Sequence, residues 1–135
     1  MKVLALDFGA RRIGIAIADT EVGVASSRPF LTNDADVIEN LSAICERSGI
    51  ERIIIGLPRG LRGETEQTAA ARDFAAELDQ KFPVEIELVD ERFTSKLASQ
   101  NLQAAGEDSR KQKKLIDSEA ARIILQEYLD SSLSQ

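Results

Sequence analysis

Acidic residues stand at three points of the sequence where a carboxylate could do chemistry, and the first is Asp7. It directly follows the apolar run of residues 3–6, which has the pattern of a strand buried on both faces. Gly9 comes two positions later, and its missing side chain lets another group approach the main chain. Position alone is compatible with a functional acid and with a carboxylate that accepts hydrogen bonds from the following turn.

Asp117 is the second acid, and it opens a segment with helical spacing. Ala120, Ala121, Ile124 and Tyr128 follow it at intervals that share one helix face. An unpaired carboxylate on such a buried face costs several kcal/mol, so it needs a metal, an arginine or a ring of donors. The alternative is a helix N-cap, where aspartate is favoured.

The third point holds two adjacent acids, Asp90 and Glu91, which follow the last strand-like segment. An ion pair with Arg92 or simple solvation would explain either one. Spacing does not choose between them.

Two basic segments could contact phosphate groups. The glycine-rich residues 56–63 include Arg59, but they lack the Gly-Lys-Ser/Thr ending of a nucleotide-binding P-loop, so a basic rim is the better interpretation. Residues 110–114 carry four positive charges directly before Asp117. Such a run is usually solvated loop, yet this location favours phosphate contact over the same site. An aromatic ladder for stacking bases is missing.

Composition narrows the chemistry further. The chain has no histidine and one cysteine, so proton transfer near neutral pH falls to carboxylates, lysines or metal-held water. The net charge of −6 means that a nucleic-acid surface must be a local basic patch. Apolar stretches are far shorter than a membrane helix, and Asp7 interrupts the N-terminal run before any cleavage site. We expect a cytoplasmic protein with no membrane partner, and we expect Cys45 in the core.

In the N-terminal half, the elements that must position these acids are three strands, a helix and a fourth strand. Residues 3–6, 13–18 and 22–31 read as three antiparallel strands, the third broken near Pro29, which cannot donate to a sheet ladder. Apolar spacing from Asp34 predicts a helix that Gly49 closes. The β-branched residues 52–56 predict a buried strand parallel to the first.

The C-terminal half continues the pattern with a helix whose inner face carries Ala71, Phe74, Ala75 and Leu78. Residues 84–88 alternate strictly and predict a strand at the sheet edge. Thr94 or Ser95 can cap a helix to about residue 105, residues 106–114 read as a mobile loop, and a last helix is expected at about 117–129. The prediction is a single α/β domain over residues 1–135, with a mixed five-stranded sheet flanked by helices.

Four motifs in this order strongly resemble the YqgF/RuvX family over nearly the whole chain. They are DFGARRIG at residues 7–14, GLP at 56–58, DERFTS at 90–95 and IDSEAA at 116–121. That family is described as a pre-16S ribosomal RNA nuclease, and earlier as a Holliday junction resolvase-like protein, with a ribonuclease H-like fold. The resemblance therefore implies a metal-dependent nuclease that acts in 5′-end maturation of pre-16S ribosomal RNA.

The resemblance also implies the site residues. Asp7, Glu91 and Asp117 would form the acidic catalytic and metal-binding set, which decides for Glu91 over Asp90. Three carboxylates suit Mg²⁺ or Mn²⁺, and two ions about 4 Å apart could activate water and stabilise the leaving oxygen. Phosphate groups of the RNA would be held by basic residues, namely Arg12, Arg11, Arg59, Lys113 and Lys114.

This chain departs from the family pattern in one loop. Gly60 stands where the family usually has asparagine, and Arg62 and Glu64 are also atypical. Substrate contacts there stay open, as do RNA against DNA and monomer against homodimer. The rival readings are a DNA junction resolvase, a sugar kinase or actin-like ATPase that shares the Asp-x-Gly step, and a non-catalytic nucleic-acid binding module.

Overall fold

The strands and helices follow one another along the chain in the order that the sequence predicts. In the computed structural model, which describes residues 1–58, 63–90 and 109–133, the strands are β1 (Lys2–Phe8), β2 (Arg12–Asp19), β3 (Ser26–Thr32), β4 (Arg52–Leu57) and β5 (Glu85–Asp90). The helices are α1 (Val37–Ser48), α2 (Glu66–Lys81) and α4 (Ser109–Leu133). The predicted helix from Thr94 or Ser95 lies outside the described residues.

The strand that carries Asp7 lies at the centre of the sheet, whose order is β3-β2-β1-β4-β5. β1 pairs antiparallel with β2 and parallel with β4, and β5 pairs parallel with β4. Parallel neighbours require a crossover, which α1 supplies between β1 and β4 and α2 supplies between β4 and β5. The predicted mixed five-stranded sheet, with β5 at its edge, is confirmed.

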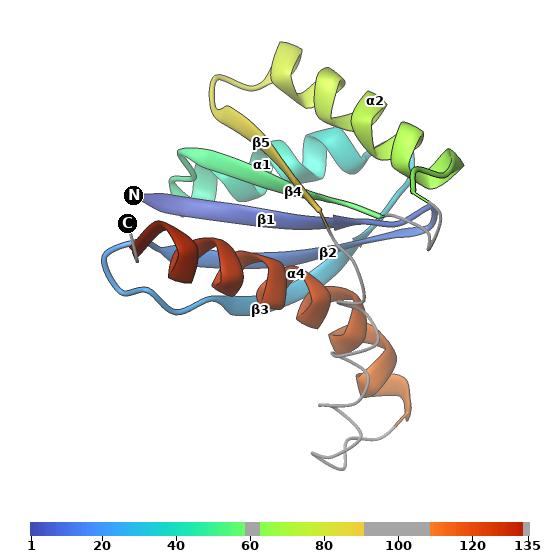
Figure 1. Ribbon diagram of the computed structural model, residues 1–135. Helices are drawn as coiled ribbons and strands as arrows, with labels where there is room; N and C mark the ends of the chain where they lie inside the picture. The colour runs from blue at the N-terminus through green and yellow to red at the C-terminus, as the bar shows by residue number, and fades with distance from the viewer. Residues whose placement is uncertain (59–62, 91–108, 134–135) are drawn as a thin grey trace.

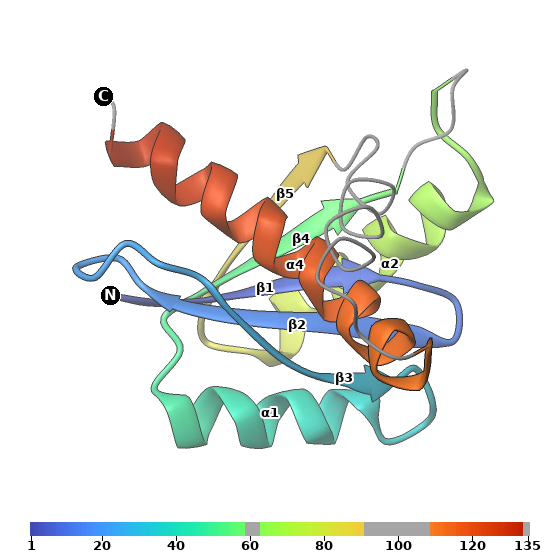
Figure 2. The ribbon, with the colours of Figure 1, turned by 90° about the horizontal axis from the view of Figure 1, so that it is seen from below.

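Helices cover both faces of the sheet, α1 and α2 on one side and α4 on the other (Figures 1 and 2). Alternate residues of β1 bury toward opposite sides: Leu4, Leu6 and Phe8 join the core under α1 and α2, whereas Val3 and Ala5 join the core under α4. Both faces of the central strand are therefore dry, as its continuous apolar run predicts.

The third strand is shorter than predicted. It begins at Ser26, and Val22 and Val24 in the preceding connection are 72% and 62% exposed. The carbonyl oxygen of Asp19 accepts hydrogen bonds from the main-chain N–H groups of Val22 and Gly23, and Gly23 has φ 81°. The apolar residues Val22 and Val24, which the sequence pattern predicts in a strand, therefore lie in this turn and the connection after it.

The last helix is longer than predicted. It begins at Ser109, so residues 109–114 are helical and the expected mobile loop is wrong for them. Arginine, lysine and glutamine are good helix formers, so a polar and basic run does not by itself indicate a loop. Figure 1 shows these first turns extending past the sheet.

Two smaller findings complete the fold. Cys45 is partly buried against the core under α1, as expected, and burial raises the pKa of its thiol to about 11. Among the described helices, none has both the length and the apolar content that a membrane span requires.

Candidate active site

Asp7 is the next-to-last residue of β1, and its side chain is on the face that α4 covers. This follows from alternation, because Val3 and Ala5 bury toward α4 and Asp7 continues that series. The residue is half-buried, whereas the apolar members of the series are fully buried. The dry face of the central strand thus ends in a carboxylate.

Glycines stand on both sides of Asp7 in the sheet. Its partner on β2 is Gly14, and its partner on β4 is Gly56. Directly paired residues of neighbouring strands share a face, so neither neighbour places a side chain beside the Asp7 carboxylate. On the sheet itself, the two strands that flank Asp7 therefore carry no side chain at its level.

Another group approaches the main chain closely at Gly9, as the sequence predicts, in the turn between β1 and β2. A Cβ atom at Gly9 would lie 2.5 Å from the carbonyl oxygen of Arg12, so the group that approaches Gly9 belongs to the turn itself. Asn33 holds the turn from β3: its main-chain N–H donates to the carbonyl of Arg11 at 2.8 Å, and its Nδ2 donates to the carbonyl of Gly9 at 2.9 Å.

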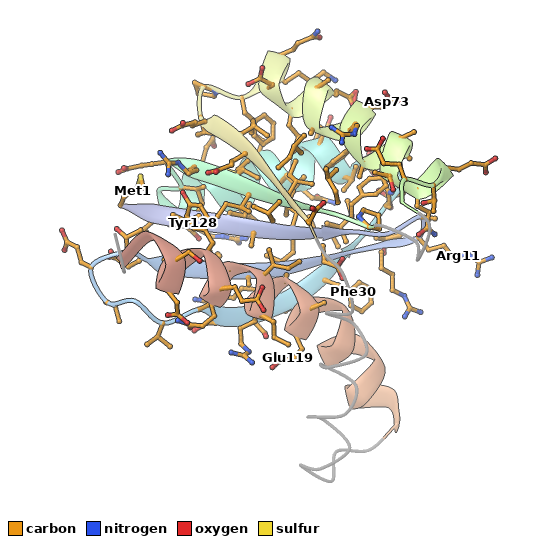
Figure 3. All side chains as sticks on the ribbon, in the orientation of Figure 1. Met1, Arg11, Phe30, Asp73, Glu119 and Tyr128 are labelled. Carbon is orange, nitrogen blue, oxygen red and sulfur yellow. The ribbon has the colours of Figure 1, made fainter. Side chains whose placement is uncertain are left out.

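The two arginines of this turn have different environments. Arg11 is exposed and extends away from the end of the sheet (Figure 3). The Arg12 guanidinium lies over the ring of Phe30, 5.1 Å from its centroid, in a cation–π contact. Phe30 could not be predicted as a partner of Arg12, because nothing local in the sequence links a β3 residue to the start of β2.

Asp117 is well inside α4, eight residues after its start at Ser109, so the alternative reading of Asp117 as a helix N-cap is wrong. The face that it shares with later residues packs on the sheet as predicted: Ala120 and Ala121 are fully buried, Ile124 is 3% exposed and Tyr128 packs against the same core. The helix that carries Asp117 therefore covers the face that carries Asp7.

The side chains of the other predicted site residues are not described. Glu91 and Arg59 are outside the described residues, and Lys113 and Lys114 are described only as part of the α4 backbone, like Asp117. Where side chains are described, no three histidine, cysteine, aspartate or glutamate residues cluster closely enough to hold a metal ion. Asp7 is thus the one member of the predicted acidic set whose side-chain placement is described.

Described residues on both sides of the atypical loop are bonded to α2. Thr68, fully buried in α2, donates a hydrogen bond from its hydroxyl to the carbonyl of Pro58. Glu64 pairs with Arg72 of the same helix, with 2.7 Å between Arg72 Nε and Glu64 Oε1. The unusual glutamate has an ion-pair partner within this chain.

Comparison with known proteins identifies the family. A family model described as RuvX, Holliday junction resolvase, matches residues 1–131. The chain belongs to the RuvX family. A relative from Maridesulfovibrio salexigens, named "Putative pre-16S rRNA nuclease", is 43% identical over 96% of this chain and 98% of its own length. A relative of the same name from Sulfurihydrogenibium sp. is 40% identical over 96% of this chain and 90% of its own length.

Solved structures agree on the fold of this RuvX family member. Thermus thermophilus RuvC in complex with a Holliday junction superposes with a TM-score of 0.61 at 13% identity, covering 100% of this chain and 97% of RuvC. A fowlpox virus resolvase bound to a Holliday junction gives a TM-score of 0.60 at 15% identity, covering 98% of this chain and 99% of the resolvase. The RuvX chain has the ribonuclease H-like fold that its motifs imply.

These findings confirm the family resemblance and the class of enzyme. The RuvX chain is a nuclease, an enzyme that hydrolyses phosphodiester bonds, and its substrate is a nucleic acid. The rival reading as a sugar kinase or actin-like ATPase is set aside, because the family model is described as a resolvase and the relatives at 40% identity or more are named as nucleases.

Proposed function

We propose that this enzyme hydrolyses phosphodiester bonds of pre-16S ribosomal RNA in 5′-end maturation, with Asp7, Glu91 and Asp117 as its catalytic carboxylates. The observation that carries the proposal is the placement of Asp7 at the end of the central strand, between Gly14 and Gly56, on the face that α4 covers. The names of the relatives support the substrate. We further propose one nuclease domain over residues 1–135, acting in the cytoplasm.

The acidic set fits a divalent cation. Asp7 offers carboxylate oxygens beside two glycines, and a chain without histidine has oxygen atoms as its main donors, which suits Mg²⁺ or Mn²⁺. When bound, such an ion lowers the pKa of water and offsets charge on the phosphate. Asp7 would be held rigidly by the central strand. Val89, near the end of β5, packs against the core under α4.

Basic residues would hold the RNA backbone. Arg12 is oriented by its contact with Phe30 beside the Asp7 turn, and Arg11 is exposed at the same turn. Lys113 and Lys114 belong to a basic run in the first turns of α4, where the helix dipole disfavours cations and favours anions. A run placed against the dipole suits a phosphate ligand, so we assign these residues, with Arg59, to phosphate contact.

A four-way DNA junction is the second candidate substrate. The family description names a Holliday junction resolvase, and the RuvC and fowlpox enzymes of similar fold were solved with that substrate. The same carboxylates would serve either reaction. Only a direct comparison of substrates separates the two candidates.

The decisive experiment incubates purified protein and Mn²⁺ with pre-16S RNA, duplex DNA and four-way junctions in parallel. We expect cleavage of the RNA, none in excess chelator, and none by Asp7→Asn. Asp90→Asn is the matched control, because Asp90 is adjacent to Glu91 but alternates with Val89 along β5. If only the four-way junctions are cleaved, the substrate is the DNA junction and not the RNA. If Asp7→Asn cleaves at the wild-type rate, Asp7 is not a catalytic residue.

A stability measurement tests the metal site without using activity. If the three carboxylates converge, their repulsion lowers stability in chelator, and Asp7→Asn should raise the free energy of unfolding by roughly 1–2 kcal/mol. Mn²⁺ in millimolar excess should then stabilise the wild type alone. A purely structural Asp7 predicts the opposite sign, because losing its hydrogen bonds destabilises. A destabilised variant together with a wild type that ignores Mn²⁺ would defeat the metal site.

A further inference from the structure

The ladder between β2 and β3 is interrupted near the candidate site. Ile13 pairs with Leu31, but Ile15 pairs with Arg28, so β3 has one residue more than β2 across this interval. The extra length includes Pro29, which has no N–H to donate. A bulge of this kind leaves main-chain groups without their usual ladder partners, and buried ones must find others.

Ser118 of α4 supplies those partners. Its hydroxyl oxygen accepts a hydrogen bond from the N–H of Ile15 at 3.4 Å, and the same hydroxyl donates to the carbonyl of Arg28. Ser118 is 1% exposed. Its own carbonyl accepts from the hydroxyl of Ser27 at 3.4 Å. One helical residue is thus tied to both strands at the bulge.

This connection links the backbone near two of the proposed catalytic acids. Asp7 pairs with Gly14 in the sheet, and Ile15 is the next residue. Ile15 is bonded to Ser118, and Asp117 is the residue before it. The hydrogen bonds of Ser118 fix the position of α4 on the sheet, and the adjacent main chain of Asp117 is fixed with it.

Other contacts hold the far half of α4. The amide of Gln126 accepts from the N–H of Ala25 and donates to the carbonyl of Gly23, both at 3.0 Å. The hydroxyl of Tyr128, in the C-terminal part of α4 (Figure 3), accepts from Arg52. Gln126 therefore makes the same kind of helix-to-main-chain bonds as Ser118, but about two and a half turns away from Asp117.

We propose that Ser118 is a positioning residue, whose hydroxyl in the β2–β3 bulge sets where α4 presents Asp117 relative to Asp7. The inference rests on the proposed function, since it assigns Ser118 to the same acidic site. The fully buried Ala120 and Ala121 let α4 approach the sheet closely enough for a side chain as short as serine to reach the strands.

The test compares Ser118→Ala with Gln126→Ala, which loses two hydrogen bonds of the same type. Mn²⁺ affinity is measured by the EPR signal of free Mn²⁺, and cleavage is resolved into kcat and KM. We expect Ser118→Ala to bind Mn²⁺ about 10-fold more weakly or worse and to lose kcat, with KM for RNA nearly unchanged. Gln126→Ala should keep both within about twofold although it is destabilised.

A second variant protects the test against loss of folding. Ser27→Ala removes only the hydroxyl that donates to the Ser118 carbonyl and to Glu119, and Ser27 is only partly buried. It should weaken Mn²⁺ binding about two- to threefold, in the same direction. If the wild type binds Mn²⁺ and cleaves nucleic acid, but Ser118→Ala and Ser27→Ala behave like Gln126→Ala, the positioning role is wrong and the proposed function still stands. A wild type that neither binds Mn²⁺ nor cleaves nucleic acid overturns the proposed function and this inference together.

Discussion

Replacing Gly9 with alanine should destabilise the protein through a steric clash in the turn after Asp7. The new Cβ would lie 2.5 Å from the carbonyl oxygen of Arg12, whereas ordinary van der Waals contact begins at 3.4 Å. Arg12 cannot simply retreat, because it pairs with Thr32 in the ladder and the turn on either side is bonded to Asn33. Relief of the clash therefore requires the turn to open.

The size of the effect follows from what opening the turn would break. Two hydrogen bonds to Asn33 contribute about 1 kcal/mol each, and overpacking strain adds roughly 1–3 kcal/mol. Alanine recovers about 0.4–1 kcal/mol by restricting the unfolded chain. We expect a net loss of about 2–5 kcal/mol, and cleavage reduced by about 10-fold or more because Asp7 is two residues away.

Urea unfolding followed by far-UV circular dichroism measures the loss, since the chain has no tryptophan. Gly49→Ala is the matched control: its site has nothing within 4 Å but a φ of +66°, so it isolates dihedral strain of roughly 1–2 kcal/mol, far from Asp7. Gly49→Ala should leave cleavage intact. If Gly9→Ala costs no more than Gly49→Ala, the clash does not control this turn.

Three other outcomes are expected. Alkylation of Cys45 at pH 8 should be about 100-fold slower in the native than in the urea-unfolded chain, because burial raises the pKa of its thiol to about 11, and equal rates would contradict the burial. For the same reason, the free energy of unfolding that this thiol contributes below pH 9 should be lost as the pH rises toward 11. Tyr128→Phe should cost about 1 kcal/mol in urea unfolding by removing the acceptor of Arg52, and an unchanged midpoint would show that the bond contributes nothing. Changing Lys113 and Lys114 to glutamine should weaken RNA binding and lower its salt slope by about 2, whereas an unchanged slope places them away from RNA.

The hydrogen bonds at Arg52 show how α4 is held at the end remote from Asp7. Its guanidinium donates to Glu85, with 2.6 Å between Arg52 Nη2 and Glu85 Oε2, and also to Tyr128. These two bonds, Glu85 first, raise the pKa of Arg52 above its ordinary value. Three elements meet there, β4, β5 and α4. The sequence offers no signal for this meeting, because the partners are far apart along the chain.

Local pattern was sufficient for the order and type of most elements. Period-two and continuous apolar runs mark strands, and the series Val37, Leu41 and Cys45 marks a helix that ends at Gly49, because burial on one face imposes these periods directly on the sequence. Pattern failed where polar residues form regular structure, at the start of α4, and where apolar residues lie in a turn, at Val22.

The sequence by itself therefore determined a ribonuclease H-like nuclease with an acid at the end of its central strand, since four motifs and one apolar period carry that information. Tertiary structure alone decided what surrounds the acid. Gly14 and Gly56 become neighbours of Asp7 only through strand register, and Ser118 bonds to partners 103 and 90 positions away. A serine inside a helix gives no local sign of such bonds, because its partners are main-chain groups exposed by a bulge in two other strands.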